Sequence, residues 1–319
     1  MLRIKALTAL YAYNRREDND LAKAEKELMF SIGKTYDLYH YLLLLLIEIA
    51  EIADEKIEQA LNKKMPTPED LNPNRRFTDN AIINQLRINQ ALKKHVSSSK
   101  LTWANYLHIP RMLYAKLTSW EPYYEYMNAS GRSYQSDKKF ITRLFAEFLT
   151  YSEDLAACLE EQSIFWNDDM EFVIAMIEKT IRKLKTDSGD DAPLMPLFKN
   201  DEDKDFVKIL FRKAVMNAKK CSGLIDRNTT NWEVERIALM DILVMQLALT
   251  EVMEFSEIPV KVTLNEYIEI AKYYCTSKSS TFVNGILDNI IKEIRIEGLI
   301  KKTGRGLLGE SHIKSEELN

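Results

Sequence analysis

Glycine and proline are scarce in this chain, which has 9 Gly and 8 Pro among its 319 residues. These two residue types are the main interrupters of regular structure, so their scarcity favours long helices over many short strands. Leu, Ile, Glu, Lys and Ala dominate the composition, which agrees with helix. The sequence therefore predicts an all-α fold, long enough for two domains or for one domain with a large insertion.

Cysteine and long apolar runs are also rare. The three cysteines, Cys158, Cys221 and Cys275, are far apart and odd in number, and the N-terminus lacks the pattern of a signal peptide. Reduced thiols in the cytoplasm are therefore expected. The longest apolar run extends only from Leu42 to Ile47, which is too short to span a bilayer. We expect a cytoplasmic protein without a membrane segment.

Patterns typical of enzymes and metal sites are incomplete. The segment 33–35 resembles the end of a phosphate-binding loop, but the glycine required five positions before Gly33 is absent, since Leu28 stands there. The segment 304–309 spells a dinucleotide-binding fingerprint, but it follows a helix and has too little chain after it for a βαβ unit. The four histidines have no metal-ligand spacing. We therefore expect no catalysis, no metal and no cofactor.

Charge limits where a nucleic acid could bind. The formal net charge is −4, so the chain as a whole does not attract a polyanion. Any RNA site must therefore be a local basic patch. The first helix is locally basic, with Arg3, Lys5, Arg15 and Arg16.

Helical periodicity and breaks in it divide the chain into parts. The predicted helical segments are 2–13, about 20–64, about 80–185, 203–220, 232–253, 260–274 and 282–296. Ser279 and Ser280 are suitable N-caps for the last of these helices. The predicted organisation is an N-terminal helical region at 1–200 with a long insertion at about 20–200, a C-terminal helical domain at 201–297, and a flexible tail at 298–319.

A distinctive motif lies in the C-terminal third. Residues 259–272 read P-x-K-V-x-x-N-E-x-x-E-x-A-K, and F-V-N-G-x-L-D follows at 282–288. With Phe211-Arg212 and the segment 232–251, this series resembles the NusB family of transcription antitermination factors. The resemblance is strong over 205–295 and weak over 2–13, where Arg3, Ala6, Leu10 and Tyr11 carry it. It implies a NusB-like helical bundle in two parts, here with a large helical insertion that resembles no family.

The resemblance also implies a function. NusB proteins bind the boxA element of ribosomal RNA leaders together with ribosomal protein S10, within the transcription elongation complex. Their RNA face is formed by the first helix and by the loop before F-V-N-G, which is 275–281 here. The RNA-binding residues implied are Arg3, Lys5, Arg15, Lys278, Thr281, Phe282 and Asn284. Tyr11 and Asp241 would lie toward S10.

Several residues of the motif have a structural interpretation beside the functional one. Phe282 could fill the core or stack on an unpaired base. Asn284 could hydrogen-bond a helix end or an RNA base. Gly285 lies inside a predicted helix, where glycine costs about 1 kcal/mol relative to alanine. We therefore expect it to mark the close approach of a neighbouring helix.

Two other functions remain compatible with the same module. One is a protein-interaction scaffold that has kept the fold while its RNA edge weakened. The other is a relative of the N-terminal module of ribosomal RNA cytosine methyltransferases, although no methyltransferase domain is expected after this module. A basic patch combining residues 3–16 with Lys278 would favour RNA binding over the scaffold, and S-adenosylmethionine binding would favour the methyltransferase relationship.

Overall fold

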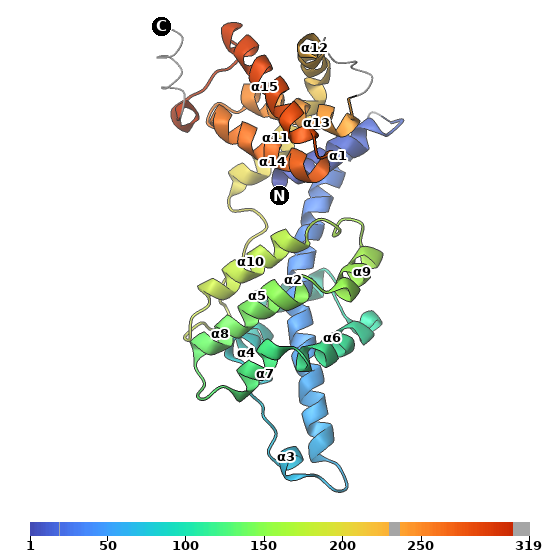
Figure 1. Ribbon diagram of the computed structural model, residues 1–319, viewed down its shortest axis with the longest axis vertical. Coiled ribbons are helices and arrows are strands. Elements are labelled where there is room, and N and C mark those ends of the chain that lie inside the picture. The colour runs from blue at the N-terminus through green and yellow to red at the C-terminus, as the bar shows by residue number, and fades with distance from the viewer. Residues whose placement is uncertain (19, 230–236, 309–319) are drawn as a thin grey trace. The chain divides into compact units, whose positions relative to one another are not determined.

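The structure, a computed structural model, describes residues 1–18, 20–229 and 237–308. Within these ranges the chain forms helices and no strand, which confirms the all-α prediction (Figure 1). The chain divides into two compact units. The terminal unit comprises Met1–Phe30 and Phe198–Asn319, and the inserted unit comprises Ser31–Leu197. None of the described helices is both long enough and apolar enough to cross a bilayer.

The terminal unit begins with α1 and the first residues of α2, and then continues from α11. Its helices are α1 (Leu2–Asn14), α2 (Leu21–Leu61) as far as Phe30, α11 (Asp201–Met216), α12 (Ala218–Asn228), α13 (Leu239–Glu254), α14 (Val260–Tyr274) and α15 (Ser279–Ile296). The predicted helix at 203–220 is in fact divided, because Asn217 ends α11 and its backbone carbonyl starts α12. Part of the predicted helix at 232–253 lies outside the described residues.

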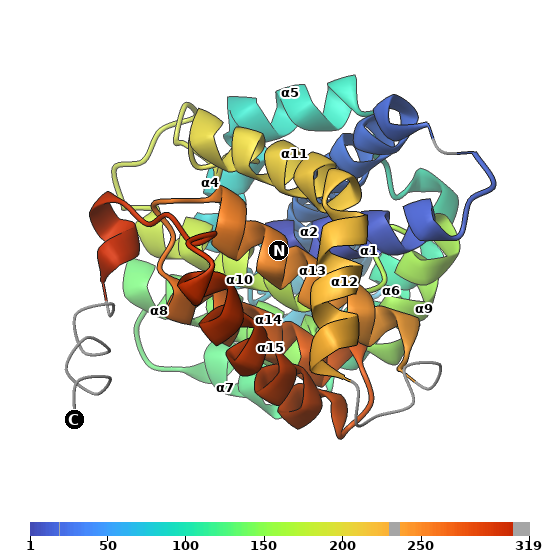
Figure 2. The same cartoon turned by 90° about the horizontal axis from the view of Figure 1, so that it is seen from above.

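Helix α13 forms the centre of the terminal unit. It contacts α1, α11, α12, α14 and α15, and Figure 2 shows these helices around it. Its residues from Leu243 to Val252 are all buried, including Gln246, Thr250 and Glu251. A helix that is buried on all sides needs internal partners for such polar side chains. Those partners determine which polar residues of this unit remain available for binding.

The C-terminal segment after α15 contacts the loop between α13 and α14. The backbone N–H of Thr303 donates to the carbonyl oxygen of Ser256 at 3.0 Å, and Lys302 Nζ donates to that of Phe255 at 2.8 Å. A short 3₁₀ helix, η4 (Gly304–Leu307), follows. The start of the predicted flexible tail is therefore packed against the unit, because this loop offers carbonyl acceptors. Residues 309–319 lie outside the described residues.

The inserted unit is built on α2 from Ser31 onward. Its other elements are α3 (Pro68–Leu71), α4 (Ala81–Ile88), α5 (Gln90–Ser98), η1 (Ala104–Tyr106), α6 (His108–Thr118), α7 (Glu121–Asn128), α8 (Tyr134–Arg143), η2 (Leu144–Leu149), α9 (Glu153–Gln162) and α10 (Met170–Lys183). The run Leu42–Ile47 faces the core of this unit, as do the rings of Tyr39 and Tyr41. Figure 1 shows the shorter helices gathered along this part of α2.

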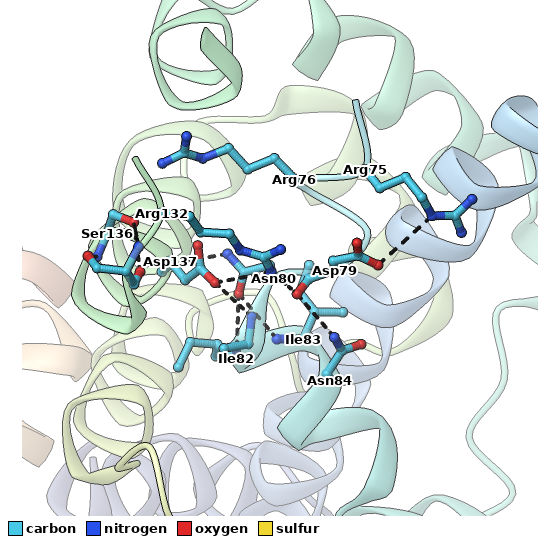
Figure 3. A network of polar contacts seen from close by, with 12 residues as sticks. Arg75, Arg76, Asp79, Asn80, Ile82, Ile83, Asn84, Arg132, Ser136 and Asp137 are labelled. Carbon is cyan, nitrogen blue, oxygen red and sulfur yellow. Dashed lines mark hydrogen bonds and ion pairs between the residues drawn. The ribbon is translucent and has the colours of Figure 1, made fainter. Parts of the chain in front are cut away.

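A buried polar network connects α4 to α8 in the inserted unit (Figure 3). The carboxylate of Asp137 accepts hydrogen bonds from the backbone N–H of Ala81 at 2.9 Å and from Tyr126 Oη at 2.7 Å. Asn80 Oδ1 caps α4 by accepting from the N–H of Ile82 at 2.9 Å. Because the N-terminal N–H groups of α4 are satisfied from within the unit, this network stabilises the fold and leaves no anion site there.

Candidate nucleic-acid interface

The loop between α14 and α15 and the first two turns of α15 carry the predicted RNA-binding residues that lie outside α1. Lys278 and Thr281 are exposed, whereas Phe282 and Asn284 are half-buried. Asn284 Nδ2 lies 3.4 Å from Asp288 Oδ2 within the same helix. Tyr273, which sequence reasoning missed, lies just before this loop and is 81% exposed. The sequence does not indicate which of the two adjacent tyrosines, Tyr273 or Tyr274, is exposed, because their side chains are identical.

The start of α15 differs from the prediction. Lys278 occupies the N-cap position, and no side chain caps the helix there. Ser279 is already helical, and its hydroxyl donates a hydrogen bond of 2.9 Å to Asp241 Oδ2. The predicted N-cap role of Ser279 and Ser280 is therefore wrong, because the buried carboxylate of α13 takes the hydroxyl of Ser279.

Asp241 is an internal residue of the terminal unit, buried at 6% exposure. Asp241 also interacts with the thiol of Cys275. The pKa of Cys275 is raised to about 12, mainly because the thiol is buried and further because the Asp241 carboxylate lies beside it. Asp241 thus connects α13 to the loop before α15. Its carboxylate does not lie on an exposed surface but bonds within the unit, and its predicted position toward S10 stays a prediction.

Arg3 is likewise engaged inside the unit. Its Nε and Nη2 each lie 2.8 Å from one carboxylate oxygen of Glu251, and its Nη1 lies 3.2 Å from Glu266 Oε2. The guanidinium also lies over the ring of Phe206, 5.2 Å from its centroid. Glu251 is fully buried and further accepts from Thr263 and Tyr267. Arg3 therefore neutralises a buried carboxylate, a role that the sequence prediction missed.

The remaining predicted residues of α1 divide between interior and surface. Lys5 is buried, at 6% exposure, so it does not contribute to an exposed basic edge as predicted. Arg15 is exposed, and its guanidinium lies 5.5 Å from the ring centroid of Tyr11. The structure thus brings Tyr11 and Arg15 together. That Arg15 and Lys278 share one basic face stays a prediction.

Gly285 does not mark a close helix contact, which corrects the prediction. It is exposed on α15, and a methyl group added to it would meet no atom within 4 Å outside its own helix backbone. The conformational freedom of glycine is then an uncompensated cost to the helix.

Gly285→Ala is accordingly expected to raise the free energy of unfolding by up to about 1 kcal/mol, because alanine has the higher helix propensity. Thermal unfolding followed by circular dichroism measures this gain. Gly306→Ala is the opposite control, since its Cβ would clash with the backbone carbonyl of Ser256. A Gly285→Ala variant that melts below the parent would contradict the open environment of this position.

Comparison with known proteins places the motif in a family. The model of the NusB family matches residues 171–292. The transcription antitermination protein NusB of Salinibacter ruber is 40% identical over 120 residues, which are 38% of this chain and 75% of that protein. The protein of the same name from Chloroherpeton thalassium is 41% identical over 105 residues, 33% of this chain and 50% of its own. No solved structure matches.

Proposed function

Because the chain belongs to the NusB family, we propose that it binds single-stranded leader RNA of the boxA type together with ribosomal protein S10, as a transcription antitermination factor. The observation that carries the proposal is the exposure of Tyr273, Lys278 and Thr281, which lie between the two parts of the family motif. The relatives of this chain from Salinibacter ruber and Chloroherpeton thalassium are named transcription antitermination proteins, which supports the role in transcription.

The chemistry of this group suits an unpaired RNA strand. An exposed tyrosine ring offers a flat face on which a base can stack, and a lysine offers a charge to the adjacent phosphate. Few exposed cations flank it, since Arg3 and Lys5 are engaged in the interior. We therefore expect the leader RNA to bind weakly to the chain alone and more tightly when S10 adds contacts of its own.

The test is the gain in affinity that S10 gives for a labelled boxA RNA, measured by fluorescence anisotropy. Tyr273→Ala is expected to weaken RNA binding in the presence of S10 by roughly 5- to 150-fold, since base stacking on an aromatic ring contributes about 1–3 kcal/mol. Tyr273→Phe keeps the ring and should bind as the parent does. Absence of any S10-dependent gain with the unaltered chain would refute the proposal.

A charge test on the same loop has a matched control on α14. Lys278→Glu should weaken binding, whereas Lys261→Glu should not, because Lys261 is exposed at the N-terminal end of the helix that has Tyr273 at its C-terminal end. Exposed charges contribute little to folding, so both variants should melt as the parent does. An equal loss of RNA affinity in the two variants would show that binding depends only on the net charge of the chain and not on the position of Lys278.

The interior positions of Arg3 and Lys5 favour one second candidate, a protein-interaction scaffold whose RNA edge has weakened. That function predicts that S10 binds the chain with an affinity that boxA RNA does not change. The same titration distinguishes the two, because thermodynamic linkage requires RNA to strengthen S10 binding if S10 strengthens RNA binding.

A further inference from the structure

Helices α8 and α10 of the inserted unit, with the residues next to their ends, carry exposed or half-exposed cations. Seven of them, hereafter the α8–α10 surface, are Arg132, Lys139, Arg143, Lys179, Arg182, Lys183 and Lys185. The two helices pack against each other, as Figure 1 shows, so these side chains come from neighbouring segments that are far apart in sequence.

Specific hydrogen bonds fix the two halves of this surface. The ammonium group of Lys138 on α8 donates to the carbonyl oxygens of Arg182 at 2.7 Å and Leu184 at 2.8 Å, at the end of α10. Gln85 Nε2 donates to the carbonyl oxygen of Lys185 at 2.7 Å. The backbone that carries the cations is therefore held in one position before any ligand binds, which reduces the entropy lost on binding.

Carboxylates neutralise only the arginines of this surface. Arg132 pairs with Asp137 at 3.5 Å, Arg143 with Glu147 at 2.6 Å, and Arg182 with Glu178 at 3.6 Å. Within the described part of the chain, no carboxylate lies within ion-pair distance of Lys139, Lys179, Lys183 or Lys185. Four exposed ammonium groups thus remain without a counter-charge at contact distance, although Asp187 borders them.

The stabilisation of helix ends by cations explains only some of the lysines of this surface. Lysines in the last turn of α10 stabilise that helix end, but Lys139 lies in the middle of α8 and gains little from either dipole. Within 125–150 and 170–208 the only exposed large apolar side chain is Phe172, near the start of α10, which is 36% exposed. Protein interfaces are enriched in aromatic residues and depleted in lysine at their centres, so this surface has the wrong composition for a protein partner.

We propose that the α8–α10 surface binds the sugar-phosphate backbone of RNA without reading its sequence. Lysines suit this task because each ammonium acts as a point charge toward a phosphate and releases a condensed counterion. Contacts of this kind position the chain on RNA, while base contacts elsewhere supply specificity. The proposal goes beyond the boxA and S10 assignment, because its residues lie outside the terminal unit, although the family match already begins in α10.

The experiment uses the full chain, a labelled single-stranded RNA of mixed sequence without S10, and a salt titration. The test variant is the triple change Lys139→Glu, Lys179→Glu and Lys183→Glu. If each lysine contacts one phosphate, the slope of log affinity against log salt becomes shallower by about 2, since each contact contributes roughly 0.7 for single strands. The affinity at low salt should fall more than tenfold.

The control is a second triple variant, Lys64→Glu, Lys93→Glu and Lys94→Glu. These lysines are exposed on other parts of the inserted unit, and no carboxylate of the described residues pairs with them. The two variants have the same net charge, so the control should keep the slope and affinity of the parent. Equal loss in both variants, or no binding by the parent at low salt, would overturn the proposal. So would equal binding of polyglutamate, which would assign the surface to acidic proteins.

Discussion

Arg3→Ala is expected to lower the free energy of unfolding of the terminal unit by roughly 3 kcal/mol, because it leaves the carboxylate of Glu251 buried without its cation. The guanidinium now donates to both oxygens of that carboxylate, at 2.8 Å each. The hydroxyls of Thr263 and Tyr267 still donate at 2.9 and 3.1 Å, which keeps the loss near the lower end of the range for a broken buried pair. Urea unfolding followed by far-UV circular dichroism measures it.

Arg212→Ala is the matched control in the same unit. Arg212 also makes two hydrogen bonds to one carboxylate, that of Glu25, at 2.6 and 2.8 Å. Its side chain is 56% exposed, however, against 20% for Arg3, so water replaces the lost contacts and the change should cost less than about 1 kcal/mol. If both variants lose the same stability, burial of Glu251 does not determine the effect.

These two arginines show what the sequence can and cannot predict about a site. Both are basic residues on helices, and nothing local distinguishes them. The partner of Arg3 lies 248 positions away, so only the packing of α1 on α13 shows that this cation is used internally. The same holds for Lys5 and Asp241, whose burial depends on which helices cover them. The exposed members of the predicted site, Arg15, Lys278 and Thr281, stay predictions as RNA contacts.

The fold was more predictable than the site, because hydrophobic periodicity is a local property. The predicted helix at 260–274 has the bounds of α14, and the stripe that begins at Phe282 lies within α15. The break at Asn217 was missed because neither glycine nor proline marks it. In the inserted unit, periodicity predicted helix from 80 to 185, but the packing of these helices on α2 depends on long-range contacts that no motif encodes.

His40 is a buried histidine of the inserted unit. Its ring is 1% exposed and stacks on the ring of His95, with the centroids 3.8 Å apart. The ring of Tyr36 meets it edge-on at 4.4 Å. Burial lowers the pKa of His40 to about 4, and His95 acts in the same direction; the hydrogen bond to the carbonyl of Tyr36 and the charge of Asp37 oppose the shift.

The inserted unit is therefore expected to lose about 2 kcal/mol of stability between pH 7 and pH 5 through His40 alone. A histidine in the unfolded chain has a pKa near 6.5, so the unfolded state takes up the proton first as the pH falls. The contribution is fully present above that pKa and declines until the folded form also protonates, near pH 4. Urea unfolding followed by tryptophan fluorescence reports it, since Trp103, Trp120 and Trp166 lie in this unit.

His40→Gln separates this histidine from every other titrating group. Glutamine cannot take up a proton in this range, so the variant should be less stable than the parent at pH 7 but should lose about 2 kcal/mol less between pH 7 and pH 5. His108→Gln is the control, because His108 is exposed and should leave the pH dependence unchanged. If the parent and His40→Gln lose stability equally over this interval, His40 is protonated in the folded unit, and its ring must then be open to water rather than enclosed between His95 and Tyr36.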